Sequence, residues 1–524
     1  MLVDARSLPT GTIIETEVCI VGAGPAGITV AREFINSRRR VVLLESGDTE
    51  FRETTQELYA GSNIGRRYFN PDDVGLRLRY FGGATNHWGG WCAVPDPLDF
   101  EMRKGIAYSG WPFSRTYLEP WYQRAQTVLQ LGPYGYACSD WGIAAEDIPP
   151  PFNGPHFICQ VLQLSPPTPF GAVYAPELRR ASGLTVYLNA NALRFNTGEG
   201  DHKVQDLSVG VLPDRRLTVR AQIYVLAVGG IENARLLLLS GREDGPGLGN
   251  DQDLVGRFFM THLEYPGGVI ALANPQMDFK FQAGRYGASY NRSGVPQRFV
   301  SYACLSEDSR RKLQLPSLRI IFEKPPIDGS SQQSHLLQGL RSAMADIYGG
   351  RIADVPQDLR SLMRAILGKA QFDPGTLLVH CASEQAPNPD SRIGLSSTTD
   401  AFGLRNVTIN WQLTAQDKQG ITCGHRLLGA EVGRAGLGRF RSSVTDDNVT
   451  WPKGMIGDQH NMGTTRMHRD PRSGVVNENC RVHGVANLYV AGSSVFPTEG
   501  TANPTLTIVA LALRLADHIK ERLT

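Results

Sequence analysis

The chain has 524 residues, and its 53 Lys plus Arg against 51 Asp plus Glu give a net charge of +2. A balance this close to zero argues against nucleic acid or an acidic membrane surface as the main partner. Apolar residues make up 41 % of the chain and charged residues 20 %, a composition that indicates a globular protein with a large core and excludes bulk disorder.

Cysteine spacing and targeting signals narrow the class of protein. The eight Cys lie far apart and form no C-x-x-C, so neither a zinc site nor a disulfide framework is predicted. The N-terminal segment carries acids and no apolar core, which is not the pattern of a secretory signal. No stretch reaches the ~18 uninterrupted apolar residues of a membrane span. We therefore expect a cytoplasmic protein without a metal and without a membrane partner.

The first clear element is a strand over 16–21, followed at once by the turn Gly22-Ala23-Gly24-Pro25-Ala26-Gly27. A helix is expected over 28–36 and a second buried strand over 41–44, which ends at Glu45. This strand–turn–helix–strand unit is the context that a dinucleotide-binding fingerprint requires.

Each fingerprint residue has a physical task. Gly22 permits the tight turn, Gly24 lets a pyrophosphate approach the backbone, and Gly27 lets the helix pack on the strand. The helix N-terminus offers free N–H groups and a partial positive charge to the phosphates. Glu45 stands near the spacing of about 20 residues that places an acid on the ribose hydroxyls. The fingerprint predicts ADP binding and does not distinguish NAD from FAD.

Later segments repeat this alternation. They are a strand over 222–228 with a helix over 231–240, a strand over 487–491, and a final, nearly all-apolar helix over 505–523. The region between them holds the strand-like runs SLRIIFE, LLVHCASE, SRIGLSS and NVTINWQL, which we expect to form an antiparallel sheet in a second domain. Residues 330–351 are helix-like and are expected to be a surface insertion.

The sequence therefore predicts two domains, each built from separated segments. The nucleotide-binding domain is assigned to residues 1–115, 190–265 and 456–524. The substrate-binding domain is assigned to residues 116–189 and 266–455.

Three further motifs accompany the fingerprint. They are YFGGATNHWGGW over 80–91, VLAVGGIENARLLLLSG over 225–241, and the pair QHNMGTTRM over 459–467 with LYVAGSSVFPTEGTANPTLTIVALALRLADHI over 488–519. Together with the fingerprint they resemble the glucose–methanol–choline (GMC) family of FAD-dependent oxidoreductases, and the GG-x-x-x-H-W form looks most like its pyranose 2-oxidase and bacterial sugar-dehydrogenase branch. Asn233-Ala234 stands where most members carry Ser-Pro, which suggests a side branch.

The resemblance implies an α/β fold: a Rossmann-like FAD-binding domain of the p-hydroxybenzoate-hydroxylase type, with an inserted α+β substrate domain. It implies FAD as the cofactor. Besides the fingerprint, the implied FAD-binding residues are Gly82, Gly83, Thr85, Asn86, His87, Ala192 beside the adenine, Gly229, Gly492, Ser493, Pro504 and Thr505. In pyranose 2-oxidase relatives the His at the position of His87 is bonded covalently to the flavin, whereas other members bind FAD without a bond. Both forms stay open for His87.

By the same resemblance, His460 and Asn503 are the catalytic pair. A neutral imidazole can accept the hydroxyl proton of an alcohol near neutral pH, while the hydride of the carbinol carbon goes to flavin N5. Asn503 either caps the last helix, since Asn is a preferred N-cap, or bonds the substrate oxygen. The resemblance favours the second role. No acidic cluster near His460 is visible that would indicate a polycationic substrate.

The predicted function is FAD-dependent oxidation of a CH–OH group of a sugar, glycoside or related polyol to an aldehyde or ketone. Aminoglycosides and C- or O-glycosides are included, and oxygen or another acceptor takes the electrons. Three alternatives remain: a lyase with redox-silent FAD, as in the hydroxynitrile lyases of this family; an NAD-linked dehydrogenase; and a flavin-binding protein without catalysis.

Overall fold

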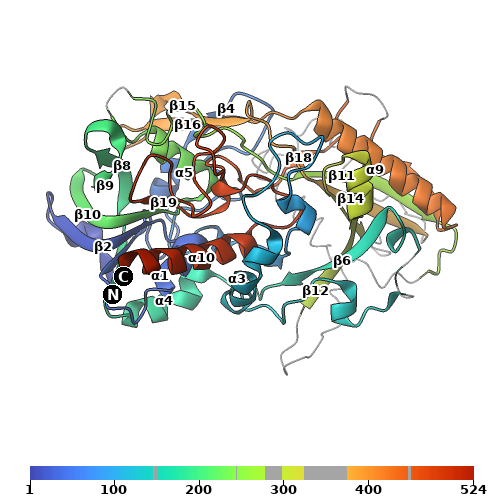
Figure 1. The fold of residues 1–524 in the computed structure, drawn as a ribbon, viewed down its shortest axis with the longest axis horizontal. Coiled ribbons are helices and arrows are strands. Elements are labelled where there is room, and N and C mark those ends of the chain that lie inside the picture. The colour runs from blue at the N-terminus through green and yellow to red at the C-terminus, as the bar shows by residue number, and fades with distance from the viewer. Residues whose placement is uncertain are drawn as a thin grey trace.

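The computed structural model describes residues 1–145, 148, 150–166, 168–242, 245–277, 298–323, 375–445 and 450–524. Two large sheets dominate these residues, one toward each end of the long axis (Figure 1). The predicted surface helix over 330–351 lies outside the described residues.

The first sheet has the strand order β1-β7-β3-β2-β10-β9-β8, with β19 also paired to β10. Its strands are β1 (Leu2–Asp4), β2 (Ile13–Val21), β3 (Val41–Leu44), β7 (Leu184–Leu188), β8 (Asn191–Thr197), β9 (Val204–Val211), β10 (Arg215–Leu226) and β19 (Leu488–Val490). The central strands run parallel, and β8 and β9 add an antiparallel edge. Buried parallel strands explain why the predicted strands are rich in β-branched residues on both faces.

Helices cover both faces of this sheet. They are α1 (Pro25–Arg32), α4 (Phe170–Arg180), α5 (Gly229–Leu238) and α10 (Thr505–Leu523), and α3 (Arg115–Val128) packs against α10. In Figure 1, α1, α4 and α10 lie on one side of the strands and α5 lies on the other. The helix α1 begins earlier than predicted because Pro25 fixes φ at its first position, and it ends before Asn36, whose φ of +66° is incompatible with a helix.

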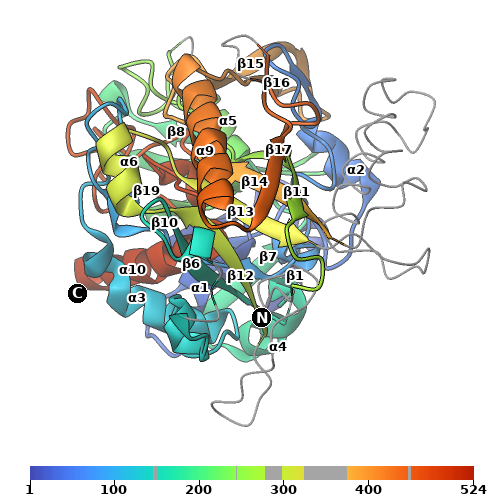
Figure 2. The same cartoon turned by 90° about the vertical axis from the view of Figure 1, so that its right-hand side faces the viewer.

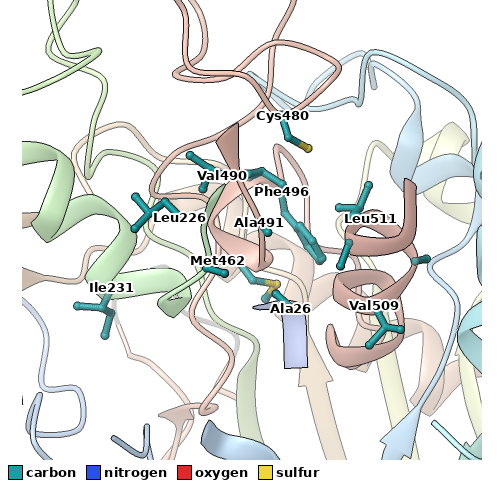
Figure 3. Packing of buried hydrophobic residues seen from close by; sticks show 14 of the residues in the cluster. Ala26, Leu226, Ile231, Met462, Cys480, Val490, Ala491, Phe496, Val509 and Leu511 are labelled. Carbon is teal, nitrogen blue, oxygen red and sulfur yellow. The ribbon is translucent and has the colours of Figure 1, made fainter. Parts of the chain in front are cut away.

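The core between these layers is apolar and continuous. Leu226 at the end of β10, Val490 of β19 and Leu511 of α10 belong to one buried cluster, together with Met462 and Phe496 from the segments between these elements (Figure 3). Because α10 is buried along most of its length, its N-terminus is held inside the molecule. Among the helices that the structure describes, none combines the length and the apolar character needed to cross a membrane.

The second sheet has the order β17-β11-β14-β13-β12-β6-β5, with β18 paired to β11. Its strands are β5 (Trp91–Cys92), β6 (Phe157–Leu164), β11 (Leu263–Leu272), β12 (Arg298–Leu305), β13 (Leu318–Glu323), β14 (Thr376–Ser383), β17 (Gly438–Ser442) and β18 (Ile456–Gly457). Every pair in it is antiparallel, as predicted. The helix α9 (Ala415–Arg434) crosses one face, with α6 (Glu307–Leu313) to its side (Figure 2).

Two of the four predicted strands lie elsewhere. β15 (Arg392–Thr399) and β16 (Arg405–Asn410) form a separate small sheet, in which β16 runs parallel to β4 (Gly61–Asn63), next in the chain after the short helix α2 (Glu53–Gln56). Their assignment to the second sheet is therefore wrong, because alternation of apolar residues indicates a strand and does not identify its partner.

The predicted domain limits differ from the sheets at several places. The limit between 265 and 266 cuts β11, and β18, which begins the last segment of the predicted nucleotide-binding domain, pairs with β11 in the second sheet. The limit between 189 and 190 separates β7 from β8, which belong to one sheet, and β5 joins the second sheet from within the first predicted segment. The exact domain boundaries stay a prediction.

Candidate active site

A cavity of ≈ 540 Å³ lies between the two large sheets. It brings together residues from every predicted motif, namely Gly22, Gly24, Glu45, Gly83, Thr85, His87, Gly229, His460, Gly492, Ser493, Asn503, Pro504 and Thr505. Ala192, in β8, lines a smaller cavity of ≈ 40 Å³, and Gly22, Ser46 and Tyr59 line both cavities. Gly27, Gly82 and Asn86 are not among the residues that line either cavity.

Three glycines turn bare backbone toward the large cavity. A Cβ added to Gly24 or Gly229 would meet no atom within 4 Å, and one added to Gly492 would meet only Asn233 Nδ2, at 3.9 Å. The φ values of Gly229 and Gly492 are +90° and +114°, which side chains rarely adopt. The ends of three neighbouring strands therefore leave open space against their backbones, as a bound dinucleotide would require.

Gly22 and Gly27 serve packing instead. Gly22 has φ +100°, and its Cβ would lie 2.6 Å from Ala227 O. A Cβ on Gly27 would lie 1.8 Å from Gly22 O, so helix α1 can approach the turn only because Gly27 has no side chain. The contact of Gly27 agrees with the packing task assigned to it from the fingerprint, and the positive φ of Gly22 agrees with the tight turn assigned to that residue.

Asn233, the residue at which the sequence departs from the main family pattern, ties two strand ends together. Its Oδ1 accepts a hydrogen bond from Val228 N at 2.9 Å. Its Nδ2 donates to Ala491 O at 3.1 Å and to Ser494 Oγ at 2.8 Å. The amide thus aligns the segments that carry Gly229 and Gly492.

Glu45 is buried at the end of β3. Its carboxylate accepts hydrogen bonds from Ala23 N at 3.0 Å and Gly47 N at 2.8 Å. Burial raises the pKa of Glu45, and the two backbone donors act in the opposite direction. In this structure Glu45 links two turns at the cavity wall, and its bond to a ribose stays a prediction.

The loop after Tyr80 is a short 3₁₀ turn, Gly83–Asn86. Asn86 Nδ2 donates to Phe81 O at 2.9 Å, and Thr85 Oγ1 donates to Gly82 O at 2.6 Å, so both side chains hold the turn in shape. His87 is exposed on the cavity wall, with Nε2 at 3.3 Å from the Tyr80 hydroxyl.

The N-terminus of α10 opens into the cavity. Pro504 occupies the N-cap position, and no side chain caps the helix. The first turn of any α-helix has N–H groups without a helical partner, and together they form a weakly positive site. The capping role that the sequence left open for Asn503 is therefore not observed, and its side chain is available to the cavity.

Asn503 and His460 meet at this point. Asn503 Nδ2 lies 3.4 Å from His460 Nε2. On its other side, His460 Nδ1 lies 2.7 Å from Asp458 Oδ2 and 3.0 Å from His262 Nδ1. Asn503 Oδ1 accepts a hydrogen bond from Arg319 Nη1 at 2.8 Å.

The charged groups around this pair perturb one another. Burial and the neighbouring His460 hold the pKa of His262 well below its usual range. Burial would raise the pKa of Asp458, but the opposing charge and hydrogen bond of His460 lower it. Burial, aided by Asp458, raises the pKa of Glu264 to about 8, while Arg319, whose Nη2 lies 3.6 Å from Glu264 Oε1, acts in the opposite direction.

Sequence reasoning missed four of these residues. Asp458 stands two positions before His460 in the same polar segment, and that proximity could have indicated it. His262 directly precedes β11, Glu264 lies at the start of β11 and Arg319 lies in β13, and no sequence motif marks any of the three. The expectation that no acidic cluster lies near His460 is wrong, since Asp458 and Glu264 both line the cavity.

Comparisons with known proteins show what this chain is similar to. Residues 387–512 match the family model described as GMC oxidoreductase. The chain is 22 % identical to the fructose dehydrogenase large subunit of Gluconobacter japonicus, over 97 % of this chain and 98 % of that protein. It is 25 % identical to the 6'''-hydroxyparomomycin C oxidase of Streptomyces lividus, over 97 % and 92 %.

The fold also matches solved structures. A formate oxidase variant of Aspergillus oryzae, studied for modification of its FAD, superposes with a TM-score of 0.57 at 16 % identity, covering 98 % of this chain and 99 % of that one. The predicted fold class is thereby confirmed.

Proposed function

We propose that this chain, an oxidoreductase of the GMC family, oxidises a CH–OH group of a sugar, glycoside or related polyol. One observation carries the proposal: His460 and Asn503 lie 3.4 Å apart at the N-terminus of α10, in the cavity that also exposes the bare backbone of Gly24, Gly229 and Gly492. An acceptor of protons and a donor of hydrogen bonds thus face the same space.

FAD is the cofactor that fits this cavity. The Gly22–Gly24 turn and the N-terminus of α1 would hold its pyrophosphate, Glu45 its ribose, and Ala192 its adenine. His87 and the N-terminus of α10 would flank its ring system. When bound, FAD supplies the two-electron acceptor for the oxidation.

His460 and Asn503 act on the hydroxyl group of the substrate. His460 Nε2 accepts the hydroxyl proton of the substrate, a task for which an imidazole is suited near neutral pH. Asn503 Nδ2 donates to the same oxygen as negative charge develops on it. The N-terminal N–H groups of α10 add positive potential at that end of the cavity.

The substrate class rests on the relatives. One is named for fructose and another for 6'''-hydroxyparomomycin C, and both match nearly the whole of this chain. We infer that a hydroxyl of a sugar or an aminoglycoside reaches His460.

A substrate panel tests the function. Purified yellow holoprotein is mixed without air with sugars, glycosides and aminoglycosides, and the visible flavin absorbance is followed. Bleaching by at least one hydroxyl compound supports the oxidoreductase, and hydrogen peroxide on admission of air identifies oxygen as the acceptor. Turnover without bleaching would indicate the lyase instead, and activity only with added nicotinamide would indicate the NAD-linked enzyme.

The attachment of FAD needs a separate test. We propose that His87, exposed on the cavity wall beside Tyr80, is the residue to which FAD is covalently attached. Acid precipitation of the holoprotein should then give a yellow pellet that becomes colourless in His87→Ala. A colourless wild-type pellet with a yellow supernatant would refute the bond.

The cytoplasmic location stays a prediction.

A further inference from the structure

The hydrogen bonds around His460 and Asn503 form one chain with a charge at each end. It runs from Arg319 through Asn503 and His460 to Asp458, over distances of 2.8, 3.4 and 2.7 Å. The Arg319 side chain is 3 % exposed, and it comes from β13 of the second sheet. Asp458 lies in the segment that follows β18.

The cationic end fixes the amide. A guanidinium has only donors, so the oxygen of Asn503 must face Arg319. The Nδ2 group of Asn503, which has two donors and no acceptor, then faces His460. It follows that His460 Nε2 must present a lone pair toward Asn503.

The anionic end fixes the imidazole. An ionised carboxylate only accepts hydrogen bonds, so the ring nitrogen 2.7 Å from Asp458 must carry the proton. If the proton were on Nε2 instead, two lone pairs would face each other at Nδ1 and two donors would face each other at Nε2. Both ends of the chain thus select the same tautomer, in which the nitrogen facing the substrate is free to accept a proton.

The backbone of Asp458 is anchored so that the carboxylate keeps its place. Asp458 N donates to His262 O at 2.8 Å, and Asp458 O accepts from Tyr68 Oη at 2.5 Å and from Thr261 Oγ1. His262 Nδ1, at 3.0 Å, adds a second acceptor for the proton on His460. The Nε2 atom of His262 is buried without a partner in the described part of the chain, which is a cost of this arrangement.

We propose that Asp458 and Arg319 are positioning residues that fix the direction of the hydrogen-bond chain through His460 and Asn503, so that His460 Nε2 is unprotonated and Asn503 Nδ2 points at the substrate oxygen. The proposal rests on the proposed function. Neither residue receives a proton or an electron in the reaction. Each sets the orientation of its neighbour in the catalytic pair.

The first test replaces the anion by an isosteric amide. In Asp458→Asn the new side chain can donate as well as accept, so His460 can hold its proton on Nε2. Flavin reduction at pH 7 should slow by about 10²-fold or more, as for loss of a general base. The other groups near His460 are His262, Glu264 and Arg319, and they are unchanged in this variant.

A second readout does not depend on turnover. In holoprotein labelled with ¹⁵N-histidine, the His460 signals, identified by their loss in His460→Gln, should show a protonated Nδ1 and an unprotonated Nε2. In Asp458→Asn the two nitrogens should exchange character or become mixed. An unprotonated Nδ1 in the wild type would overturn the proposal, whether or not a substrate is known.

The role of Arg319 is tested by removing its hydrogen-bond donor to Asn503 or by replacing that donor. Arg319→Met removes the donor to Asn503 and should slow flavin reduction by about 10- to 100-fold, the cost of a misplaced reacting group. Arg319→Lys keeps a donor and should recover part of the rate. The matched control is Asp308→Asn, an acid with 80 % exposed side chain on α6, which should change nothing.

The outcomes separate the two proposals. If no substrate bleaches the wild-type flavin, the proposed function fails, and the ¹⁵N tautomer still decides the positioning role. If the wild type is reduced and Asp458→Asn keeps both its rate and the tautomer of His460, only the positioning role fails. Equal losses of rate in Arg319→Met and Arg319→Lys would show that Arg319 does not act as a positioning residue.

Discussion

A substitution at Gly229 tests directly whether FAD binds against the exposed backbone of the large cavity. It has φ +90°, and a Cβ placed on it would meet no protein atom within 4 Å, because that space belongs to the cavity. In Gly229→Ala the protein pays only for backbone strain, roughly 1–2 kcal/mol. A bound FAD would in addition meet a methyl group at its surface. An intruding methyl in a packed site costs roughly 1–3 kcal/mol, which is about a 5- to 150-fold weaker Kd.

The control for this variant is Gly484→Ala. Gly484 has φ +77° and also has no atom within 4 Å of its Cβ position, but it lies in an exposed turn away from the cavity. Both variants should lower the melting temperature of the apoprotein similarly. Only Gly229→Ala should lose FAD, as measured by flavin content after purification and by titration of the apoprotein. Equal FAD affinity in the two variants would show that bound FAD does not contact Gly229, and the proposed placement of FAD in the cavity would be wrong.

The remaining predictions concern the base and acid stability. His460→Ala should slow flavin reduction by about 10²-fold or more in stopped-flow experiments, while His468→Ala, away from the cavity, should not; a loss under threefold would remove His460 from the base role. Burial, followed by the charge of Lys418, lowers the pKa of His425 to about 4. Its contribution to stability is therefore present above pH 6.5 and is lost as the pH falls toward 4. His425→Gln should flatten the fall of the melting temperature over that range, and an unchanged slope would contradict the buried, neutral state.

The nucleotide-binding half could be predicted from the sequence because its signals are local. The turn Gly22–Gly27 and the strand over 41–44 lie within one short segment, and their geometry is set by steric rules that apply to any chain. Gly229 and Gly492 could be predicted for the same reason, since each stands directly after a recognisable strand and leaves open space where a side chain would lie.

The substrate side could not be predicted in this way. His262 and His460 are 198 residues apart, and Arg319 and Asn503 are 184 residues apart. Their meeting depends on which strands pair in the second sheet, and residue alternation does not specify this. The same limit explains why β16 was assigned to the wrong sheet: its partner β4 has three residues and no apolar pattern.

His460 and Asn503, the proposed catalytic pair, line the cavity between the two large sheets. β18 pairs with the start of β11, and Asp458 N donates a hydrogen bond to His262 O, so the segments that carry His262 and Asp458 are joined through their backbones. Redesign of the cavity for a new substrate therefore has unequal freedom along its wall. Substitutions in β14, such as at His380, are expected to change the space available to a substrate, whereas substitutions at the start of β11 are expected to disturb the alignment of the proposed catalytic pair.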